Sequence, residues 1–262
     1  MTLPFFLDSS RGNLFCVYHP PEGPCRGSVL FFPPFAEELN KSRRMVAMQA
    51  RALAAMGHAV LCVDLVGCGD SSGDFRDARW ETWTDNLASA LEWLQKRHPV
   101  PVAFWGLRFG TLLALDFAKI HVPEKLVLWQ PIQGGDAHLT QFLRLRVASE
   151  MLAGGKTTVQ DLKNELAENG TIEVAGYELP LDIAENMAHL KLSELGIPGV
   201  RHHWLEVSAD ASLPPASARV LETWQKNGVK TEVRKVAGEP FWSTQEITDC
   251  PAMLEETAKL FQ

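Results

Sequence analysis

Trp105-Gly106-Leu107-Arg108-Phe109-Gly110 directly follows the apolar run Val102-Ala103-Phe104 and decides how this chain folds. Its glycines have the spacing of the nucleophile elbow, G-x-S-x-G, in which a buried strand turns sharply into a helix and presents the central side chain at the top of a parallel sheet. The central residue here is Arg108, whose guanidinium stays protonated at every accessible pH and has no lone pair for attack. The functional question therefore divides between an unconventional enzyme and a catalytic fold that has lost its chemistry.

The composition predicts one globular domain with room for a small insertion. The chain has 262 residues, of which 46% are hydrophobic and 22% charged, and its net charge is -7. A negative balance argues against nucleic acid as a partner, because nucleic acid requires a basic face. The five cysteines are scattered without CxxC spacing, so neither a disulfide framework nor a zinc site is predicted. We expect no metal and no cofactor.

The amino-terminal stretch predicts the compartment. Met1-Thr2-Leu3-Pro4-Phe5-Phe6-Leu7-Asp8 has no basic n-region and too short an apolar run for a signal peptide. No stretch approaches the length of a membrane-spanning helix. We therefore expect a cytoplasmic protein that is not an integral membrane protein.

Strand-like and helix-like patterns alternate along the chain. Short, mostly apolar runs predict strands at 13–18, 28–32, 59–63, 102–106, 125–129, 203–207 and 230–236. Apolar residues at helical spacing predict helices at 41–56, 80–96, 109–120, 213–227 and 253–261. Buried strands that alternate with helices indicate an α/β fold with helices on both faces of a mostly parallel sheet.

One segment, residues 136–195 (hereafter the insertion), interrupts this alternation. It contains no buried strand, but two helical patterns at 139–152 and 158–168, a ribbon-like alternation at 171–179 and a further helix at 181–191. We expect residues 1–135 and 196–262 to form the core and the insertion to form a helical lid at the active-site end. The alternative is an insertion that thickens the scaffold and has no part in access.

These motifs resemble the α/β-hydrolase superfamily over nearly the whole chain. Asp64-Leu65-Val66-Gly67-Cys68-Gly69-Asp70-Ser71-Ser72-Gly73 is similar to the D-x-x-G-x-G-x-S-x-G turn of that superfamily, and the elbow lies where it belongs. The resemblance implies an eight-stranded, mostly parallel sheet. The glycines of this turn are also a near miss to the dinucleotide fingerprint G-x-G-x-x-G, but the last spacing is wrong and the next helix starts late.

A narrower resemblance is carried by the loops around the elbow. Phe31-Phe32-Pro33-Pro34-Phe35-Ala36-Glu37-Glu38-Leu39-Asn40-Lys41, the arginine-bearing elbow, Trp129-Gln130-Pro131, Gly176-Tyr177 and Gly238-Glu239-Pro240-Phe241-Trp242 resemble the second group of exosortase A system-associated hydrolases. Members of that family are encoded with machinery for sorting proteins that bear a C-terminal anchor signal (PEP-CTERM) and for exopolysaccharide production. The resemblance implies a hydrolase by family and a protein partner from that system.

The other two members of the catalytic triad, an acid and a histidine, can be located from the order of the strands. In this fold an acid follows the penultimate strand and a histidine follows the last strand. Asp210 lies where the acid is expected, but Glu239 occupies the place of the histidine, and none of the eight histidines falls there. Cys68 and Ser71 are weaker nucleophile candidates, because no histidine is placed to activate either of them.

The energetic cost of an arginine at the elbow must be offset by favourable contacts. A bulky residue in the strained elbow conformation costs on the order of 1–3 kcal/mol, and a cation at a helix N-terminus meets the positive end of the dipole. Carboxylates suit a guanidinium best. We therefore expect Arg108 to pair with Glu239 and with either Glu37 or Glu38.

Two interpretations of such a network stay open. In the first, buried ions replace the Ser-His-Asp triad and only binding survives, either of a small anionic or acyl ligand or of a protein partner. In the second, Arg108 binds an anion or an oxyanion while Glu239 or Glu37 acts as a general base on water in ester or thioester hydrolysis.

Overall fold

A single sheet forms the centre of the computed structural model, which describes residues 2–208 and 213–262. Its eight strands follow the order β1-β2-β4-β3-β5-β6-β9-β10. Antiparallel pairing joins β2 to β1 and to β4, and the other neighbours run parallel. The strands are β1 (Leu3–Ser9), β2 (Gly12–His19), β3 (Gly27–Phe32), β4 (His58–Val63), β5 (Val102–Leu107), β6 (Lys125–Trp129), β9 (Arg201–Val207) and β10 (Lys230–Val236). The predicted mostly parallel α/β sheet is confirmed.

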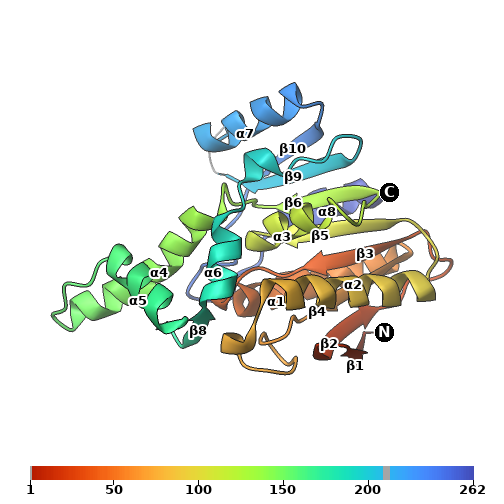
Figure 1. The fold of residues 1–262 in the computed structure, drawn as a ribbon. Helices are drawn as coiled ribbons and strands as arrows, with labels where there is room; N and C mark the ends of the chain where they lie inside the picture. Colours follow the sequence, from red (N-terminus) through yellow and green to blue (C-terminus); the bar gives the residue numbers. More distant parts are fainter. Residues whose placement is uncertain (1, 209–212) are drawn as a thin grey trace.

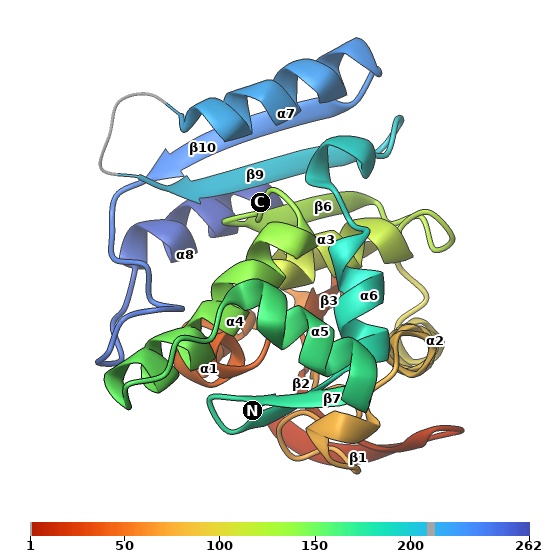
Figure 2. The same ribbon diagram turned by 60° about the vertical axis from the view of Figure 1, so that its left-hand side comes forward.

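Helices cover both faces of this sheet (Figures 1 and 2). One face packs against α1 (Glu37–Ala55) and α8 (Pro251–Ala258) through a cluster that contains Met45, Leu53 and Met253. The opposite face packs against α2 (Trp80–Arg97), α3 (Phe109–Phe117) and α7 (Pro215–Lys226). Short 3₁₀ turns lie at Phe75–Asp77, Leu192–Glu194 and Lys259–Phe261.

The insertion lies at the end of the sheet toward which the parallel strands point (Figure 1). Its elements are α4 (Gly135–Leu152), α5 (Val159–Asn169), β7 (Thr171–Val174), β8 (Tyr177–Pro180) and α6 (Leu181–Ala188). The ribbon predicted from the alternation at 171–179 is the β7–β8 hairpin. The insertion therefore lies at the end of the sheet where the elbow turns from β5 into α3.

Two differences from the sequence prediction bear on the site and on the sheet. The first helix begins at Glu37, four residues before the predicted start at Lys41, so Glu37 and Glu38 lie in its first turn and not in a loop. Carboxylates are stabilised there by the helix dipole, which explains why the helix extends through them. The strand Leu3–Ser9 was not predicted. It is an edge strand that pairs only with β2 in the sheet, so its side chains alternate between exposed and half-buried and form no continuous apolar run.

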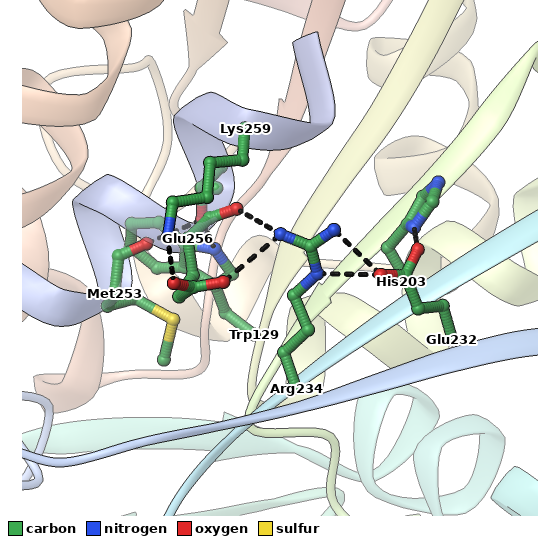
Figure 3. Close-up of polar contacts among 8 residues, drawn as sticks. Trp129, His203, Glu232, Arg234, Met253, Glu256 and Lys259 are labelled. Carbon is green, nitrogen blue, oxygen red and sulfur yellow. Dashed lines mark hydrogen bonds and ion pairs between the residues drawn. The ribbon is translucent and has the colours of Figure 1, made fainter. Parts of the chain in front are cut away.

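A separate polar cluster links α8 to β10 and to β6 (Figure 3). Arg234 of β10 lies between Glu232, at 2.7 Å, and Glu256 of α8, at 3.1 Å. Beneath it the indole Nε1 of Trp129 donates to Thr257 Oγ1 at 2.8 Å. Each charged group of this cluster thus has a partner, and the cluster joins β10 to α8.

Candidate functional site

The backbone of the elbow is intact although its central residue is an arginine. Arg108 has φ 54° and ψ -119°, a conformation that L-residues rarely adopt. The flanking glycines are sterically required: a Cβ at Gly110 would lie 2.1 Å from the carbonyl oxygen of Phe32, and one at Gly106 would lie 2.5 Å from that of Gly110. The strand-to-helix turn therefore still presents the side chain of residue 108 at the carboxyl end of β5.

Among the described residues, Arg108 makes one ion pair. Its Nε donates to Glu38 Oε1 at 3.1 Å, and the two side chains are only 17% and 18% exposed. The guanidinium carbon also lies 5.4 Å from the ring centroid of Trp242, a cation–π contact. Within residues 2–208 and 213–262, no hydrogen bond engages the two terminal NH₂ groups of Arg108. With respect to these residues, the cation therefore keeps donors that can bind another group.

Glu38 is the acid that the fold brings to the elbow. It lies in the first turn of α1, which starts after Ala36 at φ 51°. Its second oxygen, Oε2, is buried and has no hydrogen-bond partner within the described chain. Burial raises the pKa of Glu38, and the charge and hydrogen bond of Arg108 oppose that rise. The predicted contact of Arg108 with Glu37 or Glu38 is thus made by Glu38.

His138 is a member of this cluster that the sequence analysis missed. It lies in the first turn of α4, is 7% exposed, and places Nε2 4.0 Å from Glu38 Oε2. Its ring is parallel to that of Phe109, and its Nδ1 is buried with no hydrogen-bond partner in the part of the chain described. Burial, reinforced by the charge of Arg108, lowers the pKa of His138 to about 3. His138 is therefore neutral at physiological pH.

This lowered pKa predicts an acid-labile site. A histidine whose folded-state pKa lies below its unfolded value of 6.5 stabilises the fold above that value, and the stabilisation is lost as the pH falls toward 3. We expect His138→Leu to remove up to about 1.4 kcal/mol per pH unit from the acid dependence of the unfolding free energy. Urea unfolding of both proteins at pH 7.0, 5.5 and 4.5 measures this slope.

His189 provides the matched control for that measurement. It is an exposed histidine of the same insertion, whose ring bonds the carbonyl of Glu185. We expect His189→Leu to leave the acid dependence unchanged. Equal slopes for the wild type and His138→Leu would contradict a buried, neutral His138.

The expected ion pair between Arg108 and Glu239 does not form. Glu239 is exposed, and among the described residues no hydrogen bond or ion pair involves its carboxylate. The loop after β10 instead turns its aromatic residues inward, with Phe241 fully buried and Trp242 6% exposed. Burying large aromatic rings is favourable, whereas burying a second carboxylate is costly, so the ring of Trp242 lies beside the guanidinium and Glu239 faces solvent.

The other predicted site residues have different surroundings. Glu37 is exposed, and its Oε2 accepts hydrogen bonds from Tyr177 at 3.0 Å and from Asn40 at 3.4 Å. This contact links α1 to the β7–β8 hairpin of the insertion. Asp210 lies outside the described residues.

A second buried acid, Glu206, was also missed. It lies at the carboxyl end of β9, is 3% exposed, and accepts hydrogen bonds from Trp204 Nε1 at 2.5 Å and Gln130 Nε2 at 3.4 Å. Burial raises the pKa of Glu206, against the hydrogen bond from Trp204 and the charge of Arg108. Its only signal in the sequence was an acid inside an apolar strand, a place where ionised groups are rare.

The weaker nucleophile candidates on the turn after β4 have structural surroundings. Ser71 Oγ donates to the carbonyl of Asp64 at 2.6 Å and accepts from the N–H of Phe15 at 2.8 Å. Burial raises the pKa of the Cys68 thiol to about 12, so the thiolate needed for attack is scarce. Neither side chain is activated for nucleophilic chemistry.

A cavity of about 320 Å³ adjoins the cluster on the side of the insertion. Glu38, His138 and Trp242 all contribute to its wall. No group of three or more histidine, cysteine or acidic side chains within the described ranges is arranged to hold a metal ion. The arrangement thus offers a cation, a buried acid and a neutral imidazole at the edge of an accessible space.

Part of the chain matches a known family model. Residues 16–134 match the family model of the X-Pro dipeptidyl-peptidases (S15 family). A comparison with the curated proteins gives no match.

Solved structures match nearly the whole chain. A thermostable carboxyl esterase from Bacillus coagulans in complex with glycerol has a TM-score of 0.68 at 14% identity, with 98% of this chain and 96% of that chain covered. Est1E from Butyrivibrio proteoclasticus, with ferulic acid bound, has a TM-score of 0.66 at 17% identity, with coverage of 98% and 96%. This chain has the α/β-hydrolase fold.

A lid-free relative is also informative about the fold. XC6422 from Xanthomonas campestris, an α/β serine hydrolase without a lid, matches with a TM-score of 0.58 at 15% identity, covering 100% of this chain and 92% of that chain. At such identities the α/β-hydrolase likeness concerns the fold alone. Every helix in the described part of the chain is too short or too polar to cross a bilayer.

Proposed function

We propose that this α/β-hydrolase-fold protein binds a small anionic ligand at Arg108 and has no Ser-His-Asp hydrolase activity. The observation that carries the proposal is a guanidinium at the elbow position with one N–H on Glu38 and with terminal NH₂ groups that no residue of the described chain engages. A planar guanidinium with free donors is suited to bidentate binding of a carboxylate or a phosphate. The site is ionic where its relatives by fold are nucleophilic.

Three observations support the absence of triad chemistry. Arg108 replaces the nucleophile, and Glu239 stands where the histidine base is expected but faces solvent. His138, the histidine beside the site, is held neutral with a pKa of about 3 and is therefore a weak base at neutral pH. In this proposal Asp210 occupies the sequence position of the triad acid but takes no part in catalysis.

The sequence resemblance supplies the proposed setting. The loop motifs resemble the second group of exosortase A system-associated hydrolases, so we place the protein in the cytoplasm with a role in exopolysaccharide production or protein sorting. In this setting, residues 1–135 and 196–262 form the core and the insertion acts as a lid. A protein of the exosortase system is the proposed partner.

A second candidate function is an unconventional ester or thioester hydrolase. One observation favours it: the N–H of Phe109, at the start of α3, makes no hydrogen bond among the described residues and could join Arg108 in binding an oxyanion. The general base would be Glu38, whose pKa is raised by burial, because Glu37 and Glu239 are both exposed. Water would attack the carbonyl and the proton would pass to the Glu38 carboxylate.

One experiment separates these candidates. The wild type, Arg108→Ala and Glu38→Gln are assayed against panels of esters, thioesters and amides, and each is titrated calorimetrically with butyrate and with inorganic phosphate. We expect no turnover above background by any of the three, and at least a tenfold loss of anion binding in Arg108→Ala. Glu239→Gln serves as a control that leaves binding unchanged, because its carboxylate makes no contact with Arg108.

Two results would overturn the proposal. Turnover by the wild type that both Arg108→Ala and Glu38→Gln abolish would establish the hydrolase candidate instead. Equal binding of both anions by the wild type and Arg108→Ala would show that the guanidinium is not the anion site.

A further inference from the structure

A second cavity, of about 230 Å³, lies between α1 and the strands β2 and β4. Its wall includes neither Arg108 nor any residue of the insertion. Val17 of β2 and Cys62 of β4 face each other in the strand register and line it from the sheet, while Val46 and Ala47 line it from α1. The small side chains of Ala47 and Cys62 leave the space between helix and sheet unfilled.

The charged side chains of the cavity wall cancel. Arg43 donates from Nη1 to Asp64 Oδ1 at 3.2 Å and from Nη2 to Asp64 Oδ2 at 2.8 Å. Burial lowers the pKa of His19 to about 4, so its imidazole is neutral at pH 7. Burial also raises the pKa of the Cys62 thiol, which therefore stays protonated. The described residues of the wall thus carry no net charge, and an ion would lose its hydration there without gaining a counter-ion.

Three groups of the wall favour an aromatic ring over an aliphatic one. The Asp64 carboxylate occupies one edge of the planar Arg43 guanidinium and leaves its faces available for stacking on a π-system. The sulfur of Cys62 is polarisable and also belongs to the wall. The ring of Phe31 offers a further aromatic partner.

The volume sets the size of the ligand. An apolar cavity of about 150 Å³ holds benzene, so a cavity of about 230 Å³ has room for one aromatic ring with a small substituent. Two fused rings with a substituent would exceed it.

We infer that this cavity is a second ligand site, which binds a small, neutral aromatic molecule such as a phenol. The ring lies between α1 and β4, against Cys62 and Phe31 and beside the guanidinium of Arg43. Binding involves no covalent step. The site goes beyond the proposed function, because its wall contains neither Arg108 nor Glu38.

Methyl NMR of the protein labelled at valine and leucine, titrated with phenol, cyclohexanol and benzylamine at pH 7, tests the inference. We expect phenol to shift the methyl signals of Val17, Leu39 and Val46 with a dissociation constant on the order of 1 mM. Cyclohexanol has the same number of non-hydrogen atoms but no π face, so it should bind about threefold more weakly or worse. Benzylamine is protonated at this pH and should bind at least about tenfold more weakly.

Substitutions at Ala47 locate the ligand. Ala47→Phe places a ring in the cavity and should abolish the phenol shifts at Val17 and Val46. Ala47→Leu fills the cavity in part, costs little helix propensity and should weaken phenol binding about tenfold, so the test holds even where the larger side chain impairs folding. Ala55→Phe is the matched control, because Ala55 is an exposed residue of the same helix that does not line this cavity.

The outcomes separate this site from the anion site. Arg108→Ala should bind phenol as the wild type does, whatever becomes of its anion binding. Phenol shifts that persist unchanged in both Ala47 variants would overturn the inference, as would the lack of any shift at ten times the expected dissociation constant. Cyclohexanol or benzylamine binding as tightly as phenol would overturn the ligand class.

Discussion

Replacing Gly110 by alanine is expected to leave little or no folded protein at 25 °C. The new Cβ would lie 2.1 Å from the carbonyl oxygen of Phe32 and 2.6 Å from that of Pro33. Both atoms are backbone, and Phe32 belongs to the buried strand β3, so neither can move without disturbing the sheet. We expect a cost above about 4 kcal/mol, most of the stability of a typical domain. Soluble yield and urea unfolding followed by circular dichroism measure the loss.

Gly199→Ala is the matched control for Gly110→Ala. Gly199 has φ +86°, but no atom lies within 4 Å of the position of a Cβ there. Its substitution should cost only the left-handed backbone penalty of about 1–2 kcal/mol. A Gly110→Ala protein as stable as Gly199→Ala would contradict the close approach of the elbow helix to β3.

Arg108→Met is expected to destabilise the fold by about 3–5 kcal/mol at pH 8, because it leaves the largely buried Glu38 without its counter-ion. The loss should shrink at pH 5. The sign follows from the pKa of Glu38, which burial already raises and which rises further once Arg108 is removed. A carboxyl whose folded-state pKa is raised favours the fold at low pH, and that stabilisation is lost as the pH increases through the raised pKa.

The double variant Arg108→Met/Glu38→Gln tests whether the two groups act as a pair. It removes both charges, so most of the stability at pH 8 should return, and its unfolding free energy should no longer depend on the charge of residue 38. The measurement is a double-mutant cycle from urea unfolding at pH 8 and pH 5. Additive losses in the cycle would contradict an ion pair between Arg108 and Glu38.

The sequence predicted the fold well because the decisive signals are local. The elbow glycines exclude any side chain, and the apolar strands on either side can be buried only in a parallel sheet. The hairpin at 171–179 was visible as an alternation of two residues. The edge strand β1 was missed, since half of its residues face solvent and leave no continuous apolar run.

The site was only partly predictable, for reasons that lie in three-dimensional packing. The strand order correctly predicted that an acid after β3 lies beside Arg108, but the sequence did not determine whether this acid is Glu37 or Glu38. The two carboxylates have different partners: Glu38 pairs with Arg108, and Glu37 accepts from Tyr177. The predicted ion pair between Glu239 and Arg108 does not form. The loop after β10 gains more free energy from burying Phe241 and Trp242 than from a second ion pair. His138 was overlooked because it belongs to the insertion, whose placement over the elbow follows from tertiary contacts.

The crystal structure of the wild-type protein soaked with butyrate would test the central claim, that residue 108 binds an anion where a nucleophile is expected. We predict the carboxylate about 3 Å from the terminal nitrogens of Arg108. Butyrate bound with its carboxylate away from Arg108, or no butyrate at Arg108 at a concentration that saturates binding in solution, would contradict the account.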